Sequence, residues 1–149
     1  MTKLHGIIPA LTTPFDKRGD IDEAKFRNQI RFMLGKGVHG LCFGGSTGEG
    51  QALELGELRR LGEITMEEVA GRVPVVAGII ANSTTEVAAR GHLVKELGVV
   101  ALQITPPHYL FRPDDDAMVA HFSSIHADCG VPILIYNVVP WCYLSPDLL

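Results

Sequence analysis

A glycine-rich turn that carries two hydroxyl groups, "GGSTGEG" at residues 44–50, directly follows the apolar run "GVHGLCF". Its glycines, which let the backbone turn sharply and approach a ligand closely, are Gly44, Gly45 and Gly48. The next segment has a helical pattern, so we expect free N–H groups to join the hydroxyls of Ser46 and Thr47 in holding an anion. The turn has no lysine, which favours a carboxylate over a polyphosphate. A plain tight turn is the alternative.

A second stretch, "YNVVP", places Tyr136 where a buried strand reaches the edge of its sheet. A phenol there can transfer a proton if its pKa is lowered or its hydroxyl is relayed. A core tyrosine with a satisfied hydroxyl is the alternative. A third stretch, "TPPHYLFRP", is a proline-stiffened loop that presents His108, Tyr109 and Phe111 outward, either to line a site or to serve an interface.

Metal and nucleotide chemistry have little support in the sequence. The six histidines show no HxxxH spacing, and His121 and His126 are five residues apart on a predicted helix. Neither GxGxxG nor GxxxxGK[ST] follows any apolar run. We therefore expect no metal and no nucleotide cofactor, and a nucleotide-binding α/β protein is disfavoured.

The elements that must position these residues recur along the chain. Four Val- and Ile-rich runs, apolar on both faces, are typical of buried strands in a parallel sheet: "GVHGLCFGGSTGE", "RVPVVAGIIANST", "GVVALQITPPHY" and "GVPILIYNVVP". The opening "HGIIPALTTPF" is a fifth, less regular copy. Crossovers of about thirty residues separate the runs, which indicates βα units.

Helical periodicity fills these crossovers. The apolar stripes comprise Phe26, Ile30, Met33 and Leu34; Leu58, Leu61 and Ile64; and Met118, Phe122, Ile125 and Cys129. Asp20 or Asp22 can cap the first helix, "STTE" from Ser83 is a capping box for a helix that ends near Gly98, and "PDDD" suits the start of the last helix.

An open doubly wound sheet and a (β/α)₈ barrel are both compatible with βα units. Polar residues follow several different strands, which is the barrel pattern: Thr12, Thr13, Ser46, Thr47, Asn82, Thr105, His108, Tyr109, Tyr136 and Asn137. A full barrel takes about 250 residues. The sequence therefore predicts an α/β chain with roughly the first five βα units of a (β/α)₈ TIM barrel, reaching the start of a helix at "SPDLL".

Composition bounds the class of protein. The chain has 149 residues, 46% of them hydrophobic and 20% charged, with a formal net charge of -4. No basic cluster suggests nucleic acid as a partner, and no apolar run is long enough for a membrane span. Three widely spaced cysteines, Cys42, Cys129 and Cys142, favour a reducing compartment, and the N-terminus is not a signal peptide, so we expect a cytoplasmic protein.

The motifs "PALTTPF", "GGSTGEG", "VPVVAGIIANST", "ITPPHY" and "VPILIYN" occur in the order and spacing of one family. From about Gly6 to Tyr136 the chain resembles the dihydrodipicolinate synthase and N-acetylneuraminate lyase family of class I, Schiff-base aldolases. The resemblance implies a (β/α)₈ barrel, assembly into homotetramers, and lyase activity on pyruvate or another 2-oxo acid through an imine with a barrel lysine, without a cofactor.

The resemblance also implies roles for individual residues. Ser46 and Thr47, on the turn with Gly45 and Gly48, would bind the substrate carboxylate. Tyr136 would be the general acid/base, with Ser46 in its proton relay. A second tyrosine of the family often reaches a neighbouring subunit's site; here Tyr109 is the candidate for that catalytic position and His108 the alternative.

Two departures from the family pattern matter. An arginine usually follows the Tyr-Asn-Val-Pro motif, whereas this chain reads "YNVVPWCYLSP", which argues against the lysine-biosynthesis reaction. Cleavage, condensation and dehydration all stay open. The imine-forming lysine is expected on the following strand, and no lysine present stands at a strand end: Lys3, Lys17, Lys25, Lys36 and Lys95.

We therefore interpret residues 1–149 as the N-terminal portion of a single barrel domain, inactive without its remainder. The alternative is a non-catalytic half-barrel that binds 2-oxo acids or assembles structurally with a partner.

Overall fold

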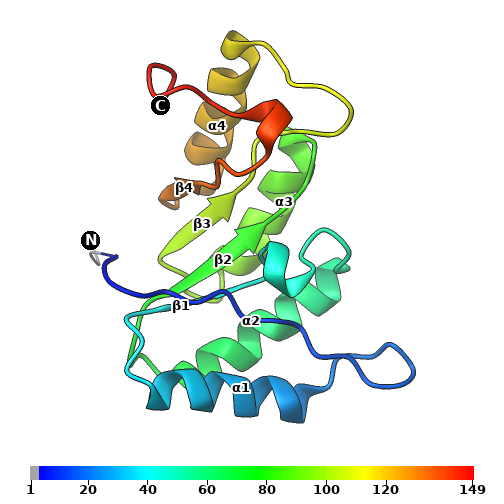
Figure 1. The fold of residues 1–149 in the computed structure, drawn as a ribbon, viewed down its shortest axis with the longest axis vertical. Coiled ribbons are helices and arrows are strands. Elements are labelled where there is room, and N and C mark those ends of the chain that lie inside the picture. The colour runs from blue at the N-terminus through cyan, green and yellow to red at the C-terminus, as the bar shows by residue number, and fades with distance from the viewer. Residues whose placement is uncertain (1–3) are drawn as a thin grey trace.

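The computed structural model describes residues 4–149 and alternates helices with parallel strands (Figure 1). The elements in chain order are α1 (Glu23–Gly35), β1 (Leu41–Phe43), the short 3₁₀ helix η1 (Ser46–Gly48), α2 (Leu55–Val69), β2 (Val75–Ile79), α3 (Thr84–Lys95), β3 (Ala101–Ile104), α4 (Asp115–Cys129), β4 (Ile133–Ile135) and the 3₁₀ helix η2 (Pro140–Cys142).

The four strands form one parallel sheet in the order β1-β2-β3-β4. Leu41 pairs with Val75, Val76 with Ala101, and Leu102 with Ile133. The predicted fifth copy at the N-terminus is reduced to one parallel bridge between Ala10 and Cys42. Pro9 in this segment has no N–H to donate to a ladder, although its carbonyl accepts from the Cys42 amide at 3.0 Å.

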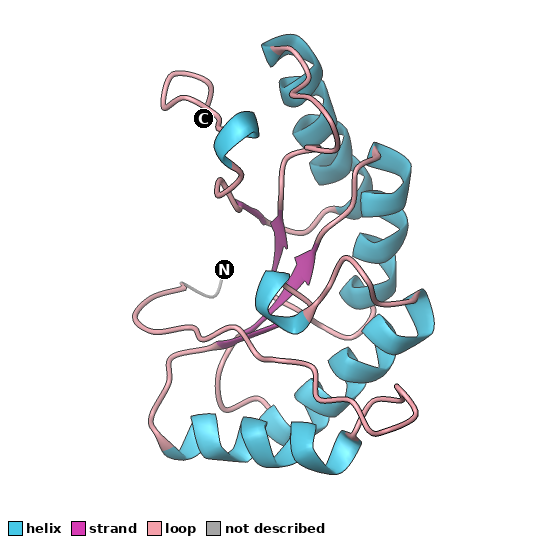
Figure 2. Ribbon diagram, turned by 45° about the vertical axis from the view of Figure 1, so that its right-hand side comes forward, coloured by secondary structure: helices cyan, strands magenta, loops and turns pink. Residues whose placement is uncertain are grey.

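The two faces of the sheet have different partners. Figure 2 shows the helices along one face of the sheet, and the core lies between them. Alternate residues such as Phe43, Ala77 and Leu102 point toward those helices and are almost fully buried. The opposite face carries a small second cluster around Cys42, Val76 and Ala101. In a barrel that face would line the interior, so the chain has the architecture of part of a (β/α)₈ barrel.

Three of the helices, α1, α3 and α4, begin where the sequence predicts. Asp22 caps α1 by accepting from the Lys25 amide, and Asp114 caps α4 by accepting from the Ala117 amide. Ser83 caps α3, but Glu86 does not complete the expected capping box, because its carboxylate pairs with Arg90 instead. All three predicted stripes face apolar clusters, with Phe26, Leu58 and Met118 buried and Met33, Leu34 and Phe122 half-buried.

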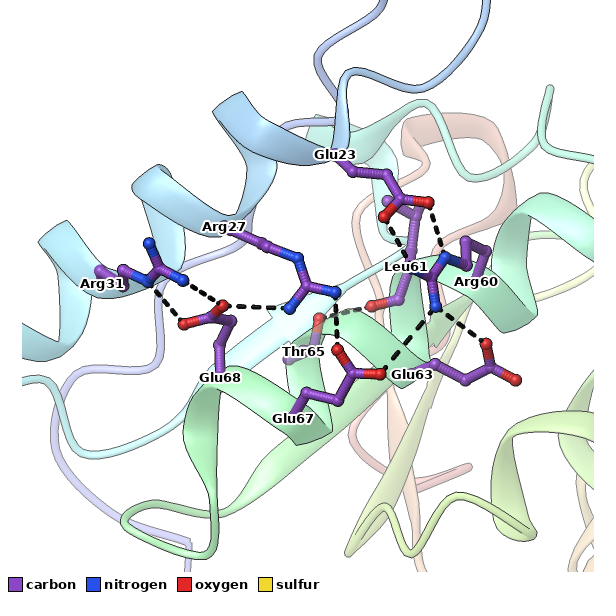
Figure 3. A network of polar contacts seen from close by, with 9 residues as sticks. All are labelled: Glu23, Arg27, Arg31, Arg60, Leu61, Glu63, Thr65, Glu67 and Glu68. Carbon is purple, nitrogen blue, oxygen red and sulfur yellow. Dashed lines mark hydrogen bonds and ion pairs between the residues drawn. The ribbon is translucent and has the colours of Figure 1, made fainter.

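An ion-pair network joins α1 to α2 (Figure 3). Glu68 accepts from both Arg27, at 3.0 Å, and Arg31, at 2.7 Å, while Arg60 reaches back to Glu23 at 2.6 Å. The Arg31 and Arg27 guanidinium groups lower the pKa of the Glu68 carboxyl. Several charges acting together on partly covered side chains stabilise the helix pair more than isolated surface pairs would.

Two further features concern the C-terminal segment. Where the sequence predicts the start of a helix, at "SPDLL", the structure has a single turn closed by the Leu148 amide on the Ser145 carbonyl. Among the described residues, β4 pairs only with β3, and Leu134 is exposed.

Within residues 4–149, no helix combines the length and apolar composition that crossing a membrane requires.

Candidate active site

The carboxyl ends of the four parallel strands meet at one edge of the sheet, so the residues that follow them form a common rim. The turn after β1 is packed directly on β2. Gly44 has φ +68°, and a Cβ atom at Gly78 would lie 2.5 Å from the Gly45 Cα atom. Glycine is therefore needed at Gly78, and also at Gly44, where a Cβ atom would lie 2.7 Å from the Leu58 side chain.

Within the turn, hydrogen bonds leave one side of its backbone free. The amides of Gly48 and Gly50 both donate to the Gly45 carbonyl at 3.0 Å, and the Glu49 amide donates to the Ser46 carbonyl at 3.2 Å. Among the described residues, no acceptor contacts the amides of Ser46 and Thr47, and both side chains are exposed. The hydroxyls and amides predicted to bind an anion are thus open to a ligand.

Two side chains from other elements fix this turn. The buried Thr13 hydroxyl donates to the Gly48 carbonyl at 2.7 Å. The Arg90 side chain on α3, only 9% exposed, donates to the carbonyls of Gly50 at 3.2 Å and Leu53 at 3.1 Å. Sequence reasoning placed Thr13 at the rim but missed Arg90. Arg90 could have been found from the sequence, because this charged residue lies between Val87 and Val94 on the apolar face of α3, which is buried.

Tyr136 follows β4 on the sheet face that points away from the helices. Its amide donates to the Ile104 carbonyl at 2.7 Å, which continues the β3–β4 ladder past Ile135. In this register Thr105 is the neighbour of Tyr136 on the same face. The Thr105 hydroxyl is buried and has no hydrogen-bond partner among residues 4–149. Tyr136 is half-buried, so its phenol has one side against protein.

The loop after β3 is held by Asn82 from the end of β2. The Asn82 side-chain carbonyl accepts from the amides of His108, at 2.9 Å, and Tyr109, at 3.0 Å. His108 turns back on the Pro106 carbonyl, at 2.9 Å, and is half-buried. Tyr109 is 72% exposed, as the sequence predicts for an outward-facing side chain. The rim is therefore a connected structure, in which β2 positions the loop of β3.

The segment after β4 is tied to the same loop. The Trp141 indole N–H donates to the His108 carbonyl at 2.9 Å, and Asn137 brackets Leu144 with two hydrogen bonds, of 2.8 Å and 2.9 Å. The Asn137 side chain therefore stabilises the backbone of the segment that follows it, through Leu144. Trp141 occupies the region in which the family pattern has an arginine and itself remains exposed.

Cys42 lies on the inner face of β1, below the rim. Its thiol contacts the Gln103 side-chain carbonyl at 3.0 Å, and burial raises the pKa of Cys42 to about 12. It is therefore a neutral donor at physiological pH and no nucleophile. Among the described residues no lysine follows a strand: Lys17 lies in a turn, Lys25 and Lys95 on helices, and Lys36 at the end of α1; Lys3 lies outside the described residues.

The chain is similar to known proteins over nearly its whole length. Residues 3–147 match the sequence profile of the Dihydrodipicolinate synthetase family. A 4-hydroxy-tetrahydrodipicolinate synthase of Nitrobacter hamburgensis is 40% identical over 92% of this chain and 46% of that protein. The chain thus spans about half the length of the curated relatives it matches.

Solved structures share the fold over almost the whole chain. A dihydrodipicolinate synthase of Acinetobacter baumannii, complexed with pyruvate, superposes with a TM-score of 0.93 at 27% identity, covering 98% of this chain and 50% of that one. A Clostridium difficile protein solved in complex with mannosamine superposes with a TM-score of 0.91 at 28% identity, covering 99% and 51%.

Proposed function

Because this chain belongs to the dihydrodipicolinate synthetase family, we propose that it supplies the carboxylate-binding and proton-transfer residues of a Schiff-base lyase that acts on pyruvate or another 2-oxo acid. The observation that carries the proposal is the turn at residues 44–50. Its backbone is closed by internal hydrogen bonds, while the hydroxyls of Ser46 and Thr47 stay exposed at the rim. The pyruvate bound to the Acinetobacter baumannii relative supports this choice of substrate.

Ser46 and Thr47 bind the substrate carboxylate in this proposal. Two hydroxyls and two free amides provide donors for its two oxygens without a compensating cation. Thr13 and Arg90 position the turn, because each donates to a backbone carbonyl within it. Neither residue contacts substrate in this arrangement.

Tyr136 transfers the proton at the carbon next to the imine. An imine draws electrons from that carbon, so a proton can leave it near neutral pH if a base of suitable position accepts it. Tyr136 is half-buried on the inner face of the sheet, and Ser46 belongs to its relay. Tyr109, exposed on the loop after β3, is a second candidate for proton transfer, in the site of a neighbouring subunit, with His108 the alternative.

The imine lysine comes from outside residues 4–149 in this proposal, because no described lysine follows a strand. Residues 1–149 are then the N-terminal portion of one barrel domain. Trp141 and Tyr143 stand after the Tyr-Asn motif and offer no cation for an acceptor carboxylate, which favours a less polar acceptor than the lysine-biosynthesis substrate. The reaction is C–C cleavage or condensation, with dehydration as a further outcome.

Assembly into a homo-oligomer is part of the same proposal. Tyr109, Leu110 and Phe111 are each more than 70% exposed at the tip of one loop, and Trp141 lies against its backbone. Apolar side chains gathered this way are typical of protein interfaces.

A non-catalytic half-barrel that binds 2-oxo acids is the second candidate function, favoured by the absence of a strand-end lysine among the described residues. Reductive trapping distinguishes the two. The 149-residue chain and any longer natural form are each incubated with pyruvate and borohydride, with borohydride alone as control, and intact masses are measured. We expect a lysine adduct in the longer form only. No adduct in either form would contradict the lyase and favour the half-barrel.

A further inference from the structure

Three side chains with metal-binding atoms converge away from the rim, two of them exposed and the third, Cys129, fully buried. His92 is in the last turn of α3, and Asp128 and Cys129 end α4. His92 Nε2 lies 3.0 Å from Asp128 Oδ2, and the ligand atoms of all three residues are within 4.8 Å of one another. We propose that His92, Asp128 and Cys129 bind a divalent transition-metal ion of the Zn²⁺ type.

The spacing suits such an ion. Zn²⁺ binds sulfur at about 2.3 Å and imidazole or carboxylate at roughly 2.0–2.2 Å, so tetrahedral ligands lie roughly 3.3–3.6 Å apart. The present upper limit of 4.8 Å means that a bound ion would draw the three atoms closer together. An imidazole, a carboxylate and a thiolate together are a donor set that favours Zn²⁺ over Ca²⁺ or Mg²⁺, which prefer oxygen ligands throughout.

Local packing directs the sulfur toward α3. Gly91 lies against it, and a Cβ atom at that position would be only 2.7 Å from Cys129 Sγ. A side chain at residue 91 would therefore displace the thiol from the group. Within residues 4–149, the only hydrogen bond of the thiol is a long one, 3.8 Å, to the Ala88 carbonyl. Burial, and then the Asp128 carboxylate, raise the pKa of the Cys129 thiol. This opposes binding, because the thiolate is the ligand and the cation must displace the proton.

The surroundings allow entry and favour positive charge. A surface groove between α3 and α4 is lined by both His92 and Asp128, which leaves the open coordination position to water. Both helices finish here, and helix carboxyl ends carry partial negative charge. Lys95 opposes the binding of a cation, since its ammonium lies close to Cys129 and Gly130.

A simple ion pair between His92 and Asp128 is the competing explanation for their close approach, and it does not involve Cys129.

The site is remote from the proposed chemistry. Helices of βα units run antiparallel to the strands, so the carboxyl ends of α3 and α4 lie at the opposite end of the sheet from Tyr136. A metal here links the last turns of two helices. Its effect is on stability, independent of whether the rim binds 2-oxo acids.

Cobalt absorption tests the proposal directly. The reduced protein is titrated with Co²⁺ alone, and the thiolate-to-metal charge-transfer band in the near ultraviolet is recorded before and after Zn²⁺ is added. We expect a band that Zn²⁺ abolishes, and a melting temperature that rises with Zn²⁺. Cys129→Ser should remove the band, while the surface changes His92→Gln and Asp128→Asn should each weaken binding by about tenfold or more. Lys95→Gln should strengthen it.

His126→Gln and Cys142→Ser are the matched controls, because they alter the same residue types outside the group. Both should bind Co²⁺ as the unaltered protein does. Binding without a thiolate band, or a band that survives Cys129→Ser, would overturn the assignment. The circular dichroism of His92→Gln and Asp128→Asn confirms that these variants are folded.

Discussion

Gly78 on β2 and Gly45 in the turn after β1 approach so closely that a Cβ atom on Gly78 would lie 2.5 Å from the Gly45 Cα and N atoms. We expect Gly78→Ala to lower the free energy of unfolding by about 2 kcal/mol or more, because backbone would have to move. Gly56→Ala is the control, since nothing lies within 4 Å of that position on α2, and it should be neutral or slightly stabilising. Urea unfolding measures both, and equal effects would refute the contact.

Arg90 connects α3 to the carbonyls of Gly50 and Leu53. Arg90→Met should cost about 2–4 kcal/mol of unfolding free energy, because two buried carbonyls lose their donors. Arg59→Met removes an arginine from exposed ion pairs with Glu63 and Glu96 and should cost less than about 1 kcal/mol. Arg90→Lys should not restore the loss, since one ammonium does not reproduce the guanidinium fork. Full rescue by lysine would contradict the role of the fork.

The exposed hydroxyls of the turn are the proposed contacts to the substrate carboxylate. Ser46→Ala combined with Thr47→Val should weaken pyruvate binding by about tenfold, because two hydroxyl donors are lost. Thr85→Val, at an exposed position of α3, should leave the affinity unchanged. Calorimetric titration with pyruvate measures both. An unaltered affinity in the double variant would remove the carboxylate role from this turn.

Tyr136 is the proposed proton-transfer residue. In a longer natural form with the imine lysine, Tyr136→Phe should lower kcat by at least about a hundredfold and leave 2-oxo acid binding largely intact. Tyr143→Phe is the matched control, since Tyr143 is an exposed tyrosine of the same segment. Steady-state kinetics and borohydride trapping separate turnover from imine formation. Unchanged turnover in Tyr136→Phe would show that the phenol transfers no proton.

His121 should make stability depend on pH. It is buried on α4, contacts the Thr84 hydroxyl at 2.9 Å, and its Nε2 atom has no partner among the described residues. Burial lowers the pKa of His121 below its usual 6.5, so the unfolded chain takes up the proton first as the pH falls. The contribution of uncharged His121 to the free energy of unfolding is therefore complete above pH 6.5 and is lost as the pH falls through the lowered pKa. His121→Gln should flatten the slope of unfolding free energy between pH 7 and 5; an unchanged slope would exclude His121 as its source.

The βα organisation could be predicted because hydrophobic periodicity is local. The stripe of Phe26 and Ile30 and the caps at Asp22 and Asp114 depend on residues a few positions apart, and all occur in the structure. The turn at residues 44–50 is equally local. Its glycines and hydroxyl residues are neighbours in the sequence, so a turn can be predicted from them alone.

Contacts between distant elements could not be predicted in this way. Arg90 meets Gly50 across forty residues, and His92 meets Asp128 across thirty-six, so neither pair leaves a periodic pattern. The two histidines five residues apart on α4 do not lie in this group. The His121 side chain contacts the Thr84 hydroxyl, and the His126 side chain contacts the Val131 carbonyl. A metal-binding group built from two helices has no signature within either helix.

The strand order of the sheet repeats the order of the chain, and this bears on how the protein forms during synthesis. Strands begin at Leu41, Val75, Ala101 and Ile133, so each pairs with the one made 34, 26 or 32 residues before it. At about 5–20 residues per second, a ribosome releases each new unit within roughly 1–7 seconds of the last. Each new strand can then pair with the edge of the strand made before it. The sheet can therefore extend from its amino-terminal strand before later parts of the chain are made.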